Sequence, residues 1–127
     1  MSERPEVAKG QAAKGATHVG ELQNREIIDD AVRRIVHQFD PDQVILFGSY
    51  ARGEADRDSD LDLLVVLPQV SSRRDVRVAI RLALDDIGLP KDVLVYTPQE
   101  MERSRDLPGS VVRAALTEGI VLYERAA

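Results

Sequence analysis

The spacing of apolar residues after position 21 predicts a helix that ends near Asp40. Apolar side chains recur every three to four residues, which places them on one helical face; they are Ile28, Val32, Ile35 and Phe39. Asp40 stands directly before Pro41, and the residue before a proline is disfavoured in the helical region. The helix is therefore expected to stop before Pro41.

Short apolar runs predict four strands. They are 43–47, 61–67, 91–97 and 120–123. The first is partly β-branched and bounded by Pro41 and Gly48, which is typical of a strand. The second is apolar on both faces and closed by Pro68, so we expect it to lie in the centre of a sheet.

Three more helices are expected between and after these strands. Ser71 is a candidate N-cap, and the helix behind it is expected to end at Gly88. Its apolar face is Val76, Ile80, Ala83, Leu84 and Ile87. Pro98 and Pro108 each suit the first turn of a short helix. The last helix is expected to end at Gly119 with four residues turned inward: Val111, Val112, Ala115 and Leu116.

This order of elements predicts an α/β (α+β) fold, with helices covering one small mixed β-sheet. The chain has 127 residues, which is the size of one domain. Residues 1–20 are rich in Ala, Gly, Lys and Glu and are broken by three glycines. We interpret 1–20 as a flexible N-terminal tail and 21–127 as the folded domain.

Composition excludes several classes of function. The chain has no cysteine, which excludes disulfides, thiolate zinc sites and cysteine nucleophiles and suits a cytoplasmic protein. The formal charge is −5, so we expect no direct binding to nucleic acid, which requires a broad basic surface. The longest apolar run, 63–67, is far too short to span a membrane, and we expect no membrane association.

The segment Gly48-Ser49-Tyr50-Ala51-Arg52-Gly53 combines features of a phosphate-binding turn. Gly48 and Gly53 can adopt conformations that let backbone amides approach a ligand closely. If Ser49 begins a short helix, its free N–H groups favour an anion such as phosphate. Ser49 adds a hydroxyl donor, and Arg52 adds a guanidinium suited to phosphate oxygens.

Carboxylates follow this turn and predict a metal site. Acids occupy every second position from Glu54 to Asp62. Asp60 and Asp62 stand at the entry to a strand, where residues two apart share a face. Asp92 is a third carboxylate, near the start of the next strand. Oxygen-only donors favour Mg²⁺ or Mn²⁺, and three converging carboxylates are the donor set of a two-metal phosphoryl-transfer site.

Each feature also has an ordinary structural interpretation. A Gly-Ser pair is most often a simple turn. Alternating acids are often a solvated edge, and Asp92 can cap a helix or pair with an arginine. The order of the features favours the functional interpretation: a strand, a Gly-Ser turn, a fixed gap, Asp-x-Asp on a strand, and then a strand with one acid.

That order resembles the DNA polymerase β-like nucleotidyltransferase superfamily. The resemblance rests on Gly48-Ser49, ten residues, and then Asp60-Leu61-Asp62. The fuller strings Gly48–Gly53 and Ser59–Leu63 resemble its minimal nucleotidyltransferase branch. Members of that branch are commonly antitoxins paired with a helical HEPN-domain toxin ribonuclease. The resemblance implies transfer of AMP from ATP, with Mg²⁺, onto a tyrosine of that toxin.

The resemblance also assigns roles to residues. It implies that Asp60 and Asp62 bind the metal ions, two Mg²⁺ with Mn²⁺ as the alternative. It implies that Asp92 is a third metal ligand and the base for the incoming hydroxyl. Gly48 and Ser49 match the loop that holds the triphosphate, and Arg52 is assigned a phosphate contact. The expected partners are ATP and the HEPN toxin, in a hetero-oligomer.

Two other functions stay open from the sequence. One is an antitoxin without catalysis, which neutralises its partner by occupying it; apolar surface on the last helix and on 120–123 would support that docking. The other is nucleotidylation of a small molecule. Replacing Asp60 and Asp62 separates catalysis from occupation.

Overall fold

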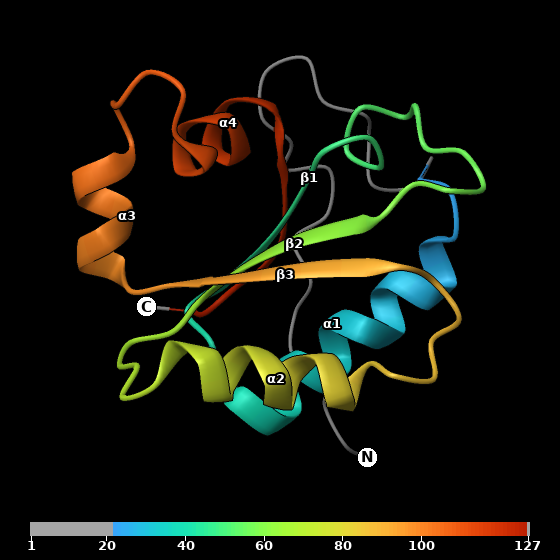
Figure 1. The fold of residues 1–127 in the computed structure, drawn as a ribbon, viewed down its shortest axis with the longest axis horizontal. Coiled ribbons are helices and arrows are strands. Elements are labelled where there is room, and N and C mark those ends of the chain that lie inside the picture. The colour runs from blue at the N-terminus through green and yellow to red at the C-terminus, as the bar shows by residue number, and fades with distance from the viewer. Residues whose placement is uncertain (1–21, 127) are drawn as a thin grey trace.

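The computed structural model describes residues 22–126, so the predicted tail at 1–20 lies outside the described residues. Eight elements follow one another in this region (Figure 1). The helices are α1 (Arg25–Phe39), α2 (Arg73–Ala83), α3 (Pro98–Ser104) and α4 (Val111–Glu118). The strands are β1 (Gln43–Phe47), β2 (Leu61–Val66), β3 (Lys91–Tyr96) and β4 (Ile120–Glu124). The predicted order of helices and strands is confirmed.

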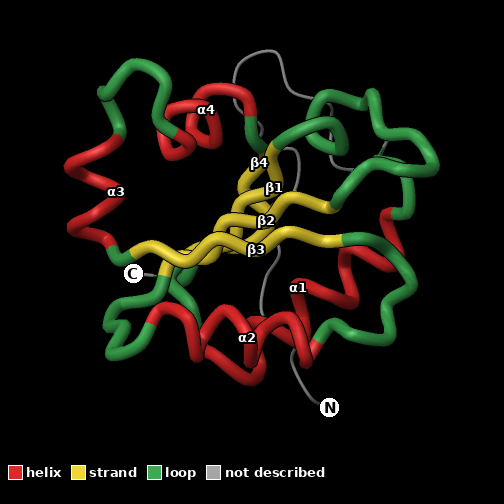
Figure 2. Tube along the Cα trace, viewed as in Figure 1, coloured by secondary structure: helices red, strands yellow, loops and turns green. Residues whose placement is uncertain are grey.

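The four strands form one mixed sheet in the order β3-β2-β1-β4 (Figure 2). β1 runs antiparallel to both β2 and β4, whereas β2 and β3 are parallel. β2 is an inner strand, as its apolar pattern predicted. The α/β fold with a small mixed sheet is confirmed. No helix between residues 22 and 126 is both long and apolar enough to cross a membrane.

Helices cover the two faces of the sheet unequally. α1 and α2 lie together over one face (Figure 1), where alternate strand residues such as Leu63, Val65 and Val93 enter the larger core. The opposite face carries a smaller core in which Leu64 and Val66 pack with residues of α3 and α4. Because side chains alternate along a strand, Asp62 and Asp92 fall on this second face.

Two arginines of α2 close the free edge of β3. Arg73 Nε donates to the carbonyl of Val95 at 3.0 Å, and Arg77 Nε donates to the carbonyl of Val93 at 3.0 Å. An edge strand with open carbonyls invites pairing with another chain. The two guanidinium groups therefore satisfy and shield this edge.

α2 differs from its prediction at both ends. The N-cap is Ser72, whose hydroxyl accepts from the Asp75 N–H at 3.3 Å, so the assignment to Ser71 is wrong. The helix ends at Ala83 rather than before Gly88. Beyond it, tight turns still bury Leu84 and Ile87, so the apolar spacing continues after the regular helix has ended.

α4 begins later than Pro108. Gly109 has φ +80°, which interrupts a helix, and Ser110 is the N-cap, accepting from the Arg113 N–H at 3.0 Å. Of the four residues expected to face inward, Val112 and Ala115 are buried. The other two, Val111 and Leu116, are 39% and 38% exposed. Their inward placement is therefore wrong, because the shorter helix buries only a narrow stripe.

The structure also differs from the expectation at the ends of two strands and at the apolar surface predicted on 120–123. β2 and β3 each end one residue earlier than expected, at Val66 and Tyr96. β4 buries Ile120, Leu122 and Tyr123. The docking surface expected on 120–123 is therefore mostly buried, whereas Val111 and Leu116 of α4 are exposed.

Candidate active site

The turn after β1 spans residues 48–53 and is built around two glycines, so we call it the glycine turn. Gly48 has φ +75° and Gly53 has φ +73°, a region that favours glycine. The N–H groups of Ala51 and Arg52 donate to the Gly48 carbonyl at 3.1 and 3.2 Å. These bonds form consecutive turns rather than a helix, so the short helix considered at Ser49 does not form.

Buried side chains hold this turn against α1. Tyr50 is only 3% exposed and Ala51 is fully buried. The Tyr50 hydroxyl accepts from Asn24 Nδ2 at 3.2 Å, and Gln23 Nε2 donates to the Ala55 carbonyl at 2.8 Å. Sequence reasoning missed Gln23 and Asn24, since nothing local marks polar residues before a helix as partners of residues 32 and 26 positions away.

The three predicted carboxylates come to the same end of the sheet. Asp62 of β2 lies opposite Asp92 of β3 in the parallel register, and Asp60 immediately precedes β2. Asp62 also lies against the glycine turn: a Cβ added to Gly48 would sit 2.2 Å from Asp62 Oδ2. We call the group Asp60, Asp62 and Asp92 the acidic end of the sheet.

The pKa of Asp62 reflects the charges of its neighbours. Asp62 is half-buried, and its pKa is raised to about 6, first by burial and then by the charges of Asp92 and Asp60. The guanidinium of Arg52 opposes that rise. Such a shift disfavours the ionised carboxylate, and carboxylates crowded in this way are a recurrent feature of functional sites.

The other acids of this segment have structural roles. Asp56 Oδ1 accepts from the Asp58 N–H at 2.9 Å, and the Asp56 N–H donates to Ser59 Oγ at 2.9 Å. Glu54 Oε1 accepts from Arg52 Nε at 3.0 Å. The side chains of Glu54 and Asp56 therefore make contacts within the loop, whereas Asp60 and Asp62 belong to the acidic end.

Arg52 and Asp92 each have an ion-pair partner. Arg52 Nη1 lies 3.7 Å from Glu118 Oε1 of α4, in addition to its bond to Glu54. Asp92 Oδ1 lies 4.0 Å from Arg77 Nη2. Arg52 is thus close enough to Asp62 to lower the pKa of that carboxyl. The guanidinium of Arg52 also contacts the carboxylates of Glu54 and Glu118.

The donor chemistry of the acidic end suits a hard divalent cation. Asp60, Asp62 and Asp92 offer only carboxylate oxygens, the ligand type that Mg²⁺ and Mn²⁺ prefer. After burial, repulsion from Asp92 and Asp60 contributes to the raised pKa of Asp62, and a bound cation relieves repulsion of this kind. Within residues 22–126, no three His, Cys, Asp or Glu side chains are drawn together into a ready ligand shell.

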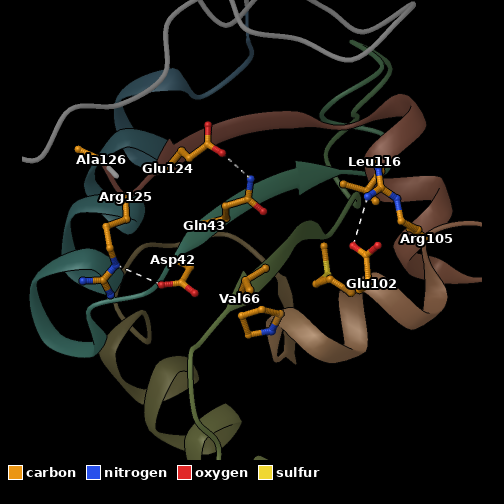
Figure 3. A pocket seen from close by; sticks show the side chains of 11 residues that line it. Asp42, Gln43, Val66, Glu102, Arg105, Leu116, Glu124, Arg125 and Ala126 are labelled. Carbon is orange, nitrogen blue, oxygen red and sulfur yellow. Dashed lines mark hydrogen bonds and ion pairs between the residues drawn. The ribbon is translucent and has the colours of Figure 1, made fainter.

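A separate cavity lies at the other end of the sheet (Figure 3). Its volume is about 410 Å³, and its apolar lining includes Val66, Met101 and Leu116. None of the predicted site residues lines it. We call this region the cavity end.

A family model identifies the class of protein to which this fold belongs. The family model of the nucleotidyltransferase domain matches residues 28–122. The match covers the glycine turn, all three carboxylates, the strands β1, β2 and β3, and the first three residues of β4. The chain belongs to this family.

Curated relatives include proteins of different overall size. The chain is 44% identical over 106 residues to "Putative protein adenylyltransferase MJ1305" of Methanocaldococcus jannaschii, covering 78% of the chain and 71% of that relative. It is 42% identical over 84 residues to a bifunctional uridylyltransferase/uridylyl-removing enzyme of Bordetella pertussis. That match covers 62% of the chain and only 10% of the enzyme, so the chain spans about a tenth of this relative's length.

Solved structures share the fold at low identity. A putative nucleotidyltransferase from Sulfolobus solfataricus matches with a TM-score of 0.52 and 20% identity, covering 79% of each chain. A toxin–antitoxin crystal structure with AMP-PNP matches with a TM-score of 0.49 and 22% identity, covering 76% of this chain and 73% of that one. The first likeness supports the fold.

Proposed function

We propose that this protein transfers AMP from ATP to a hydroxyl group of a partner protein. One observation carries the proposal: the Asp62 carboxylate lies directly against Gly48 of the glycine turn and in register with Asp92. A turn suited to phosphate and a cluster suited to a cation thus adjoin. Phosphoryl and nucleotidyl transfer depend mainly on such positioning and charge neutralisation.

The residues take the following roles in this proposal. Gly48, Ser49 and Arg52 bind the β- and γ-phosphates of ATP. Asp60, Asp62 and Asp92 hold Mg²⁺, with two ions as the working expectation and Mn²⁺ as a substitute. When bound, the metal neutralises phosphate charge. Asp92 accepts the proton of the attacking hydroxyl, which is consistent with its half-buried place on the β3 strand next to Asp62.

The proposed acceptor is a tyrosine of a helical HEPN-type toxin ribonuclease, and the protein acts as its antitoxin in a hetero-oligomer. The name of the M. jannaschii relative supports a protein acceptor. The Gly48–Gly53 and Ser59–Leu63 strings support the antitoxin branch. The net charge of −5 would favour encounter with a basic partner.

A labelling experiment tests the reaction. The protein is incubated with Mg²⁺, a purified candidate toxin, and ATP labelled on either the α- or the γ-phosphate. AMP transfer predicts label on the toxin from α-labelled ATP only. Asp60→Ala with Asp62→Ala should abolish the label, and Asp85→Ala with Asp106→Ala, which removes two exposed acids elsewhere, should preserve it.

The same variants separate catalysis from occupation in cells. If Asp60→Ala/Asp62→Ala fails to neutralise the toxin, transfer is the function. If this variant still binds and fully neutralises the toxin, the protein acts by occupation and the proposal is wrong. Label on a small molecule instead of the toxin would favour small-molecule nucleotidylation.

A further inference from the structure

Arg52 is held by two carboxylates at the mouth of the glycine turn. Its Nε donates to Glu54 Oε1 at 3.0 Å, and its Nη1 lies 3.7 Å from Glu118 Oε1. Glu54 is a neighbour within the same loop, whereas Glu118 reaches Arg52 from the end of α4. The guanidinium is therefore shared between the turn and a distant helix.

The backbone that follows Glu118 is tightly packed. The next residue, Gly119, has no room for a side chain: a Cβ would lie 2.3 Å from the Ala115 carbonyl oxygen and 2.7 Å from the Leu46 carbonyl oxygen. Leu46 belongs to β1, the strand that leads into Gly48. The end of α4 is thus packed against the same strand that delivers the glycine turn.

Helix stability gives no local reason for an acid at this position. The last turn of a helix carries the negative end of the helix dipole, where a carboxylate is unfavourable and a cation is favoured. α4 has no basic residue in its last turn, and Glu118 is its final residue. Its described charged partner is Arg52.

We propose that Glu118 is a positioning residue that draws the guanidinium of Arg52 toward α4 when no nucleotide is bound, and that it competes with the ATP triphosphate for this group. This inference rests on the proposed function, because it assigns Arg52 to phosphate. A carboxylate and a phosphate oxygen accept from the same kind of guanidinium N–H group, so a phosphate that binds Nη1 of Arg52 replaces Glu118 there. The competition sets the affinity for ATP without taking part in transfer.

Glu118→Gln tests the competition, because it keeps the size of the side chain and removes its charge. Exposed ion pairs are weak, so ATP should bind about two- to fivefold more tightly. The KM for ATP should fall by a similar factor, with the change falling on KM rather than on kcat. Calorimetry with ATP and Mg²⁺ measures the affinity directly. Glu102→Gln is the matched control, since Glu102 pairs with Arg105 at 3.3 Å on α3.

A double variant isolates the contact. In an Arg52→Ala background, Glu118→Gln should no longer alter ATP affinity. Unchanged or weaker binding by Glu118→Gln would overturn the inference while leaving the proposed function standing. If the unaltered protein fails to bind ATP, both the inference and the proposed function are wrong.

Discussion

The two ends of the sheet treat charge in opposite ways. At the cavity end, acids are matched with polar or basic partners: Arg125 Nε lies 3.1 Å from Asp42 Oδ1, and Gln43 Nε2 donates to Glu124 at 3.1 Å (Figure 3). At the acidic end, burial and then the charges of Asp92 and Asp60 raise the pKa of Asp62, and the guanidinium of Arg52 offsets only part of that rise.

This difference distinguishes charged side chains that pair with one another from carboxylates that are crowded together. Paired ions at a surface satisfy each other and contribute little beyond local order. Crowded carboxylates weaken the fold unless a ligand compensates them, and such arrangements are concentrated at active sites. The cavity of about 410 Å³ lies at the cavity end, whereas the residues predicted for the chemistry lie at the other end, so the cavity by itself would have pointed to a different region.

The largest expected contrast is in activity. Asp62→Asn should reduce AMP transfer by about 10²–10³-fold, because it removes a charge from the proposed cation-binding cluster. Glu124→Gln makes the same change of charge at the cavity end, and its rate of AMP transfer should stay within about twofold of the rate of the unaltered protein. Initial rates with α-labelled ATP measure both. Equal losses in the two variants would remove the distinction between the ends.

A pair of glycine substitutions tests the contact between Gly48 and Asp62. Gly48→Ala combines a left-handed backbone with a Cβ that would lie 2.2 Å from Asp62 Oδ2. Gly109→Ala has the same backbone strain, with φ +80°, but meets nothing within 4 Å. We expect a cost of about 1 kcal/mol for Gly109→Ala and about 2–3 kcal/mol for Gly48→Ala.

Urea unfolding gives both free energies, and transfer assays complete the comparison. Activity should fall only in Gly48→Ala, since Gly109 precedes α4 and lies outside the site. Equal destabilisation by the two substitutions would show that the backbone strain dominates and that Asp62 yields to the added methyl group.

Stability should depend on pH through Asp62. Its pKa is raised to about 6, above the value of about 3.9 for an unfolded aspartate. The native state therefore binds more protons between these values, and stability falls as pH rises through 6. Asp62→Asn should match the unaltered protein at pH 4 and exceed its unfolding free energy by about 1–2 kcal/mol at pH 8.

Urea unfolding at the two pH values, without divalent cations, checks this dependence. Asp58→Asn is the control, because Asp58 is exposed in the loop before the acidic end. A gain of equal size at pH 4 and pH 8 would assign the effect to something other than ionisation.

The smallest effect is expected at the start of α3. Thr97 and Glu100 form a capping box, in which the Thr97 hydroxyl accepts from the Glu100 N–H at 3.2 Å. Thr97→Ala should lower the unfolding free energy by about 1 kcal/mol and leave transfer unchanged. Thr97→Ser keeps the hydroxyl and should restore most of the loss. A drop in activity with Thr97→Ala would show that a change at the start of α3 affects the acidic end, and it would contradict the expected independence of the two ends.

Local patterns determined most of the elements and the members of the acidic end. Strands such as 43–47 were predictable because β-branched runs bounded by Pro and Gly are short-range signals. The Gly48-Ser49 and Asp60-Leu61-Asp62 strings are also local signals, and they carried the prediction of four candidate site residues. Element ends were less certain: apolar spacing continues to Ile87, although α2 ends at Ala83.

Only the tertiary structure decided which of these residues meet. The parallel register of β2 and β3 places Asp92 opposite Asp62, and no local pattern fixes the register between strands. The contact of Gly48 with Asp62 depends on the antiparallel pairing of β1 with β2. Glu118 reaches Arg52 because α4 packs against β1. Periodicity is a property of neighbours in the chain, whereas register and packing come from burying whole faces together.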